Sequence, residues 1–158
     1  MDSLLYTLTL VAALGAGLVA GIFFAFSAFI MMALGRLPPR GGISAMQSIN
    51  VVVLNPAFLA AFFGTAAVAL ALAIIALTGW SQSGTLYLIA GALLYLVGTI
   101  FVTIAFNVPL NNRLASVKPD SAEGASTWGH YLSAWTAWNH VRTGASLAAS
   151  ASFIMALR

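Results

Sequence analysis

Residues 131–157 read YLSAWTAWNHVRTGASLAASASFIMAL, and Arg142 is the only charged residue in this stretch. A run of about 20 mostly apolar residues is long enough to cross a bilayer as a helix. If this stretch does so, Arg142 lies roughly ten residues below one membrane surface, where an arginine costs about 2.5–3.5 kcal/mol on insertion scales. Its side chain must therefore face protein, water or a ligand rather than lipid.

The sequence offers Arg142 no obvious carboxylate partner. The chain has three acidic residues, Asp2, Asp120 and Glu123, and we place all three in a terminus or a loop. The guanidinium must then meet amide side chains, backbone carbonyls, loop acids folded inward, or an anionic or strongly polar small molecule. The last alternative would make this position a binding site.

The composition predicts a single polytopic membrane domain over residues 1–158. Hydrophobic residues make up 61% of the chain and charged residues 6%, which excludes an ordinary soluble globule. A net charge of +3, scattered along the chain, excludes nucleic-acid binding. No cysteine is available for a disulfide, a zinc thiolate site or an iron–sulfur cluster, and two histidines with three acids are too few for a two-metal carboxylate site. We therefore expect no metal.

Hydropathy and helix signals predict an all-α, four-helix transmembrane bundle. Asn55-Pro56 is typical of a helix start, and Pro109 is expected to end the third helix. ISAMQSINVVVLN is too short and polar to span, so we expect a short interfacial or re-entrant helix between the first two spans. The predicted spans are residues 4–34, 56–78, 84–107 and 131–157, with the interfacial helix at 43–54.

Charge distribution predicts the orientation in a cytoplasmic membrane. Arg36, Arg40, Arg113 and Lys118 lie in the two longer loops, whereas the opposite side holds Arg158 and the amino terminus. The positive-inside rule then places loops 35–55 and 108–130 in the cytoplasm.

Small residues predict where the helices approach one another. Two rows recur at helical spacing and indicate close packing within the bundle or in a homo-oligomer. They are Ala13, Gly17, Gly21 and Ala25 in the first helix, and Gly84, Gly91 and Gly98 in the third.

Polar residues predict a pocket in one half of the membrane. At 100° per residue Trp135, Trp138, Asn139 and Arg142 share one helix face, whereas His140 points away from it. Each asparagine alone could be a cap and each tryptophan an interface anchor, but the buried charge favours a binding site. The candidate pocket residues are Gln47, Asn50, Asn55, Thr103, Asn107, Asn111, Asn112, Trp135, Trp138, Asn139, His140 and Arg142.

Four motifs give the chain a family resemblance. GLVAGIFFAFSAFIMMALGRLPPRGGISAMQSIN, LNPAF, NVPLNNRLA and WTAWNHVRT together resemble the small integral-membrane family named for the anthrone oxygenases. The resemblance implies oxidation of an anthrone to an anthraquinone by O₂, without a recognised metal or flavin motif. On this hypothesis Trp135 and Trp138 stack the substrate, Arg142 with Asn139 and Asn107 stabilises an anion, and His140 or a water it polarises takes the proton.

Three functional classes remain open from the sequence. The protein is a membrane oxygenase, a non-enzymatic binder or carrier of a quinone-like lipophile, or a structural subunit in which Arg142 serves assembly. We predict no cofactor, although a haem with His140 as its single axial ligand stays an alternative.

Overall fold

The computed structural model describes residues 3–78 and 84–158, which form helices joined by short turns, with no strand in these ranges. The first helical run joins α1 (Ser3–Ala25), the π segment η1 (Phe26–Ile30) and α2 (Met31–Gly35). After it come α3 (Pro39–Val52) and α4 (Pro56–Thr78). The next run joins α5 (Thr85–Tyr95), η2 (Leu96–Phe101), η3 (Thr103–Asn107) and α6 (Val108–Ala115), and α7 (Ala122–Ala156) ends the chain. The prediction of an all-α protein is confirmed.

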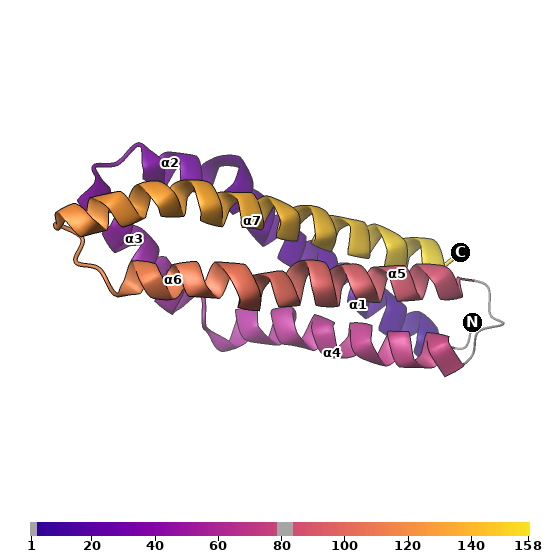
Figure 1. The fold of residues 1–158 in the computed structure, drawn as a ribbon. Coiled ribbons are helices and arrows are strands. Elements are labelled where there is room, and N and C mark those ends of the chain that lie inside the picture. Colours follow the sequence, from indigo (N-terminus) through magenta and orange to yellow (C-terminus); the bar gives the residue numbers. More distant parts are fainter. Residues whose placement is uncertain (1–2, 79–83) are drawn as a thin grey trace.

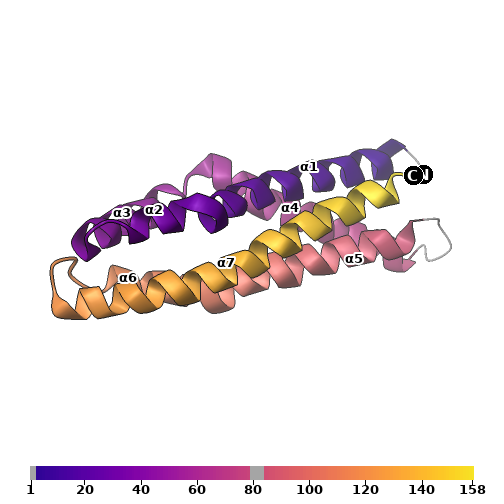
Figure 2. The same cartoon turned by 90° about the horizontal axis from the view of Figure 1, so that it is seen from above.

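The long helices lie side by side as an elongated bundle (Figure 1). The amino and carboxyl termini lie together at one end, as a second view also shows (Figure 2). The α2–α3 corner and the α6–α7 turn lie at the other end, where the short α3 packs against α6 and α7. Helix α7 runs along the whole bundle and contacts α1 on one side and α5 on the other.

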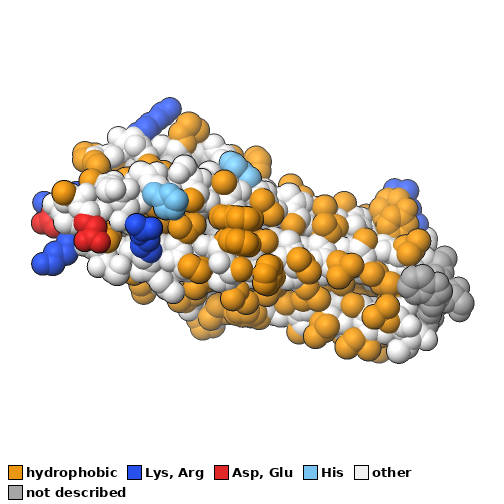
Figure 3. All heavy atoms as spheres, in the orientation of Figure 1, with side chains coloured by type: hydrophobic (Ala, Val, Ile, Leu, Met, Phe, Trp, Pro, Cys, Tyr) orange, Lys and Arg blue, Asp and Glu red, His pale blue; other side chains and the backbone are white. Residues whose placement is uncertain are grey.

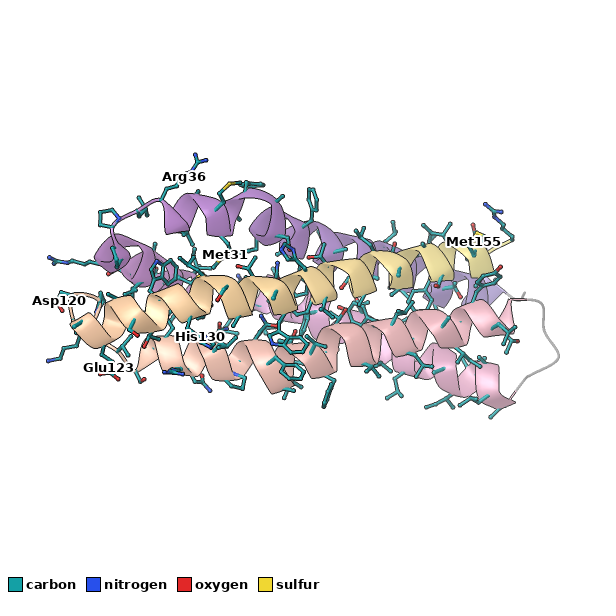
Figure 4. All side chains as sticks on the ribbon, turned by 45° about the horizontal axis from the view of Figure 1, so that its top comes forward. Met31, Arg36, Asp120, Glu123, His130 and Met155 are labelled. Carbon is teal, nitrogen blue, oxygen red and sulfur yellow. The ribbon has the colours of Figure 1, made fainter. Side chains whose placement is uncertain are left out.

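Three helical runs are long and apolar enough to cross a membrane, within the described residues: 3–35, 56–78 and 85–115. On the face in Figure 3, charged side chains lie toward the ends of the molecule, and the surface between them is largely apolar. Asp120 and Glu123 lie at the end opposite Met155 (Figure 4). The length and composition of these helices are therefore consistent with an integral membrane protein. Helix α7, at 35 residues, contains the stretch predicted as the fourth span but is not one of these three runs.

Two predicted helix boundaries are wrong. The third helix does not end at Pro109 but continues to Ala115, because Pro109 stands in the first turn of α6, directly after the π turn of η3, where its missing N–H is tolerated. The last helix begins at Ala122 rather than near Tyr131, because the Ser121 hydroxyl caps it by accepting from the Gly124 N–H at 2.9 Å. Glu123 thus lies in a helical first turn and not in a loop.

Glycines set the distance between the third helix and α7. A Cβ at Gly91 would lie 2.7 Å from the Phe153 ring, and one at Gly98 would lie 2.4 Å from the Ala145 Cβ. Gly84 has a φ of +91° and approaches the Ala156 carbonyl. The predicted glycine row of this helix therefore faces α7, as expected for close packing.

The small-residue row predicted for the first helix is confirmed only in part. Ala13 is buried and a Cβ at Gly17 would lie 3.3 Å from Ser150 Oγ of α7, whereas Gly21 has no atom within 4 Å of an added Cβ and is exposed. A second row, Ala12, Ala16 and Ala20, is fully buried in the core. Both rows have four-residue spacing, so the sequence alone does not tell which of them faces the bundle.

Gly98→Ala should destabilise the protein, because the Ala145 Cβ is held by the backbone and cannot rotate away from the new methyl group. We expect a loss of about 1–3 kcal/mol, typical of overpacking, seen as a lower midpoint of thermal unfolding in detergent.

Gly64→Ala is the matched control, since nothing lies within 4 Å of its added Cβ in α4. It should be neutral or stabilising by up to about 1 kcal/mol, the helix-propensity gain of alanine. Equal destabilisation by both changes would contradict the packing described.

Candidate functional site

Three π-helical segments surround the middle of α7, within the described residues. η1, η2 and η3 each pack against α7. In a π turn each N–H bonds to the carbonyl five residues back, so the regular α-helical ladder is interrupted and backbone groups become available to side chains. Such turns are frequent at functional sites. The sequence analysis gave no indication of them.

Arg142 extends from α7 into this region and is buried, with 4% of its surface exposed. Its Nη2 donates to Asn139 Oδ1 at 2.7 Å, and its Nη1 donates to Thr103 Oγ1 at 3.2 Å. Its Cζ lies 4.1 Å from the centre of the Phe23 ring and 5.1 Å from that of Trp135. The guanidinium is thus held by neutral oxygens and two aromatic faces, contacts that stabilise a cation without neutralising it.

Asn139 holds the guanidinium in place by hydrogen bonds of its side-chain amide. Its Nδ2 donates to the Phe23 carbonyl at 2.8 Å and to Ser27 Oγ at 2.7 Å. Both acceptors lie at the junction of α1 with η1. Because both donor bonds point toward α1, the Oδ1 atom is left to accept from Arg142. Asn139 is fully buried and orients Arg142 rather than facing a ligand.

No carboxylate of the described chain lies near Arg142. Glu123 precedes it by nineteen residues on the same helix, which corresponds to about 28 Å along the axis. Asp120 lies in the turn before that helix (Figure 4). Of the alternatives open from the sequence, loop acids folded inward are therefore excluded for Asp120 and Glu123.

A cavity of about 370 Å³ opens beside the guanidinium. Pockets for small ligands are typically about 300–1,000 Å³ and mostly apolar, with a few polar groups that fix orientation. This cavity lies between α1, α3, α4, the η3–α6 run and α7. Its polar lining residues are Gln47, Asn50, Thr103, Asn111, Asn112 and Arg142. Its aromatic lining residues are Phe23, Phe26, Phe58, Phe62, Phe63 and Trp135.

Two residues that line the cavity each have a buried N–H donor without a hydrogen-bond partner among the described residues. The donors are Arg142 Nε and Trp135 Nε1, and their residues are 4% and 5% exposed. Leaving a buried donor unpaired costs about 1–3 kcal/mol, more for a charged group. A ligand oxygen would recover this free energy only if the Arg142 or Trp135 side chain turned its N–H toward the cavity.

Seven of the predicted pocket residues line the cavity: Gln47, Asn50, Thr103, Asn111, Asn112, Trp135 and Arg142. Some of these also have structural contacts. Gln47 Nε2 donates to the carbonyls of Leu114 and Val117 at 2.9 and 3.1 Å and so closes the end of α6. Asn111 Oδ1 accepts from the Tyr131 hydroxyl at 2.7 Å.

The other five candidates do not line the cavity. Asn55 is a helix cap, which was the alternative to a pocket role, since its Oδ1 accepts from the Phe58 N–H at 3.0 Å. Asn107 and Asn139 are buried behind the wall, and Asn107 Nδ2 donates to the Trp135 carbonyl at 3.2 Å. Trp138 stacks on Phe106 at 3.7 Å between ring centres, and His140 is exposed on the outside of α7.

Sequence reasoning missed two features of the site. Ser27 accepts from Asn139 and lies 3.1 Å from Thr143 Oγ1, so it ties α1 to α7. Phe58 and Phe62 stack at 5.5 Å between ring centres and form an aromatic wall on α4. A single serine and a pair of phenylalanines in apolar helices carry no signal that separates them from ordinary packing residues.

Comparison with known proteins gives one match. A sequence model of the family described as "Anthrone oxygenase" matches residues 57–152, more than half of the chain. No curated protein and no solved structure matches significantly. The matched range includes α4, the η3–α6 run and the part of α7 that carries Trp135, Asn139 and Arg142.

Asn139→Leu should destabilise the protein, because it leaves the Arg142 guanidinium, the Phe23 carbonyl and Ser27 without their partner. A double-mutant cycle with Arg142→Met separates the two parts of this effect. We expect the double variant to lose about 1–3 kcal/mol less than the sum of the single variants, measured by unfolding in detergent. Simple additivity would contradict the orienting role of Asn139.

Proposed function

The chain belongs to the anthrone oxygenase family, and from this premise we propose that it oxidises a planar, anthrone-like phenolic substrate with O₂ in the cavity beside Arg142. The observation that carries the proposal is the buried guanidinium on the cavity wall. It has no carboxylate partner among the described residues and keeps one N–H unpaired.

Arg142 supplies what an oxyanion intermediate needs. A positive charge held in a largely apolar site stabilises an adjacent negative charge far more than it would in water. The buried Trp135 N–H, which has no partner among the described residues, is a second donor next to the cavity. Because Asn139 and Thr103 fix the guanidinium in advance, little reorganisation is required when charge develops on the substrate.

The aromatic lining suits a flat ring system. Phe23, Phe26 and Trp135 line the cavity together with Phe58 and Phe62 of α4, and the Phe23 and Phe62 rings meet edge to face with 6.2 Å between their centres. Aromatic pairs favour stacked or edge-to-face contacts with ring centres 4.5–7 Å apart, as a rule. A fused aromatic substrate would be bound by these rings while its oxygen points to Arg142 and Trp135.

The chemistry balances with O₂ as the only co-reactant. An anthrone loses a proton from its ring CH₂, and the electron pair moves to the carbonyl oxygen to give an enolate. The carbanionic carbon reduces O₂ and forms a C–O bond to a peroxide. Loss of the second C–H proton with cleavage of the O–O bond gives the quinone carbonyl and one molecule of water.

The proton leaves without help from His140 in this proposal. His140 and His130 are both exposed and neither lines the cavity, which also leaves a haem in this cavity without a histidine ligand. We propose that stabilisation of the enolate by Arg142 makes the substrate acidic enough for water to accept the proton. No cofactor is required in this scheme.

The same proposal includes four membrane crossings. We propose that α7 crosses with the three apolar runs, because it packs between α1 and α5 along the whole bundle. Helix α3 then lies at the interface, next to the exposed Arg36 and Arg40. We propose that the membrane is the cytoplasmic membrane. The positive-inside rule then places this end of the bundle in the cytoplasm.

Arg142→Met should abolish turnover of a hydroxyanthrone. We expect a loss of about 10²–10³-fold, the usual effect of removing one oxyanion donor. The measurement is oxygen uptake and anthraquinone formation by the detergent-purified protein, corrected for autoxidation. Replacing a buried charge by an apolar side chain of similar volume is often tolerated, so the variant should fold.

His140→Ala is the matched control on the same helix and should retain turnover, because its side chain lies outside the cavity. Loss of turnover in His140→Ala with retention in Arg142→Met would contradict the proposal. Tight binding of the quinone without turnover by the native protein would instead favour a carrier.

A further inference from the structure

The cavity has an opening on the side of the bundle. Its exposed lining residues belong to the α3–α4 corner and to the η3–α6 run. They are Val51, Leu54, Phe63, Ile104, Val108, Asn112 and Ala115. Helix α4 packs on α1, α5 and η2, whereas the cavity separates its first turns from η3 and α6. We call this opening the lateral mouth.

The lateral mouth extends from the charged end of the bundle, where Asn112 and Ala115 lie beside Arg113, into the hydrocarbon layer. Arg113 marks the charged end of the η3–α6 run, and Ile104 precedes it by nine residues, about 14 Å along the helix. None of the lining residues at the mouth is charged. The side chains around it are mainly Val, Leu, Ile and Phe, with 39–73% of their surface exposed. Such a rim suits contact with lipid tails.

A buried cluster packs between α2, α3 and α7 at the charged end of the bundle and shares Met46 and Trp135 with the cavity wall. Met31, Ile43 and Met46 pack there with Trp128 and Tyr131 as part of one buried cluster. A Cβ at Gly42 would meet the Trp128 ring at 2.7 Å, so α3 and α7 are in close contact. Gln47 of α3 also donates to the carbonyls of Leu114 and Val117, which joins α3 to the end of α6 and the turn after it. A lipophilic molecule therefore finds a packed core between the aqueous end and the cavity.

We propose that the substrate enters from one leaflet of the bilayer through the lateral mouth, between the first turns of α4 and the η3–α6 run. This inference rests on the proposed function for the identity of the substrate, a lipid-dissolved aromatic, but not for the route. The polar groups of Arg142 and Thr103 then meet the substrate oxygen only after the ring system has passed the apolar rim.

The route can be tested without turnover, because the chain contains no cysteine. Leu59→Cys places one thiol on the cavity wall, at a half-buried lining position. In vesicles it should react about tenfold or more faster with a lipid-soluble maleimide than with a charged, membrane-impermeant thiol reagent, each relative to an exposed Ser116→Cys variant. Faster labelling by the charged reagent would overturn the proposal.

A second substitution tests passage through the mouth itself. Ile104→Trp, at the rim, should slow labelling of Leu59→Cys by about tenfold or more. Val97→Trp is the control, since Val97 is exposed on the same helical run but does not line the cavity, and it should have no effect. Equal labelling rates in both double variants would overturn the lateral route.

Phe58→Cys repeats the test should Leu59→Cys not fold. The two proposals fail separately in this design. Absence of hydroxyanthrone turnover in the native protein counts against the proposed function alone, and unchanged labelling in Ile104→Trp counts against the lateral mouth alone.

Discussion

The structure depends on the burial of one uncompensated cation. Taking a guanidinium out of water carries a penalty of several kcal/mol that only good contacts offset. Here the contacts are Asn139, Thr103 and the faces of Phe23 and Trp135, with the acids of the described chain too far away to take part. This unpaired charge beside a cavity is the reason we propose that an electron-rich oxygen binds there.

The backbone supplies the oxygens and the space that this arrangement requires. The junction of α1 with η1 offers the Phe23 carbonyl to Asn139, and η3 brings Thr103 to the other side of the guanidinium. Gly91 and Gly98 bring the third helix against α7, and Gly98 meets Ala145, one turn from Arg142. The third helix and α7 are thus in close contact beside the guanidinium, and the cavity opens between α4 and the η3–α6 run, toward the charged end. The π turns, which disturb regular helix, occur where the ligand site is proposed.

Much of the fold and part of the site could be predicted from the sequence. Hydropathy and the Asn55-Pro56 signal indicate the long helices, and α4 occupies the residues expected for it. The lack of other charges around Arg142, and the helical spacing that puts Trp135 on the same face, predicted that both residues belong to the pocket. The burial of Asn139 behind Arg142 could not be read from periodicity, because residues of one helix face differ in depth. The helix continues through Pro109 because a π turn precedes it, and α7 begins at Ala122 because Ser121 caps it. Hydropathy does not indicate either local feature.

The most direct test of the account is the ionisation of a bound ligand. A 1,2-dihydroxyanthraquinone changes its visible absorption when its phenol loses a proton, so its pKa can be titrated while it is bound to the protein in detergent. The account predicts a pKa about 1–3 units lower than in empty micelles, as for an acid beside an arginine, with the shift lost in Arg142→Met. An unshifted or raised pKa in the native protein would contradict the claim that Arg142 serves as an oxyanion site.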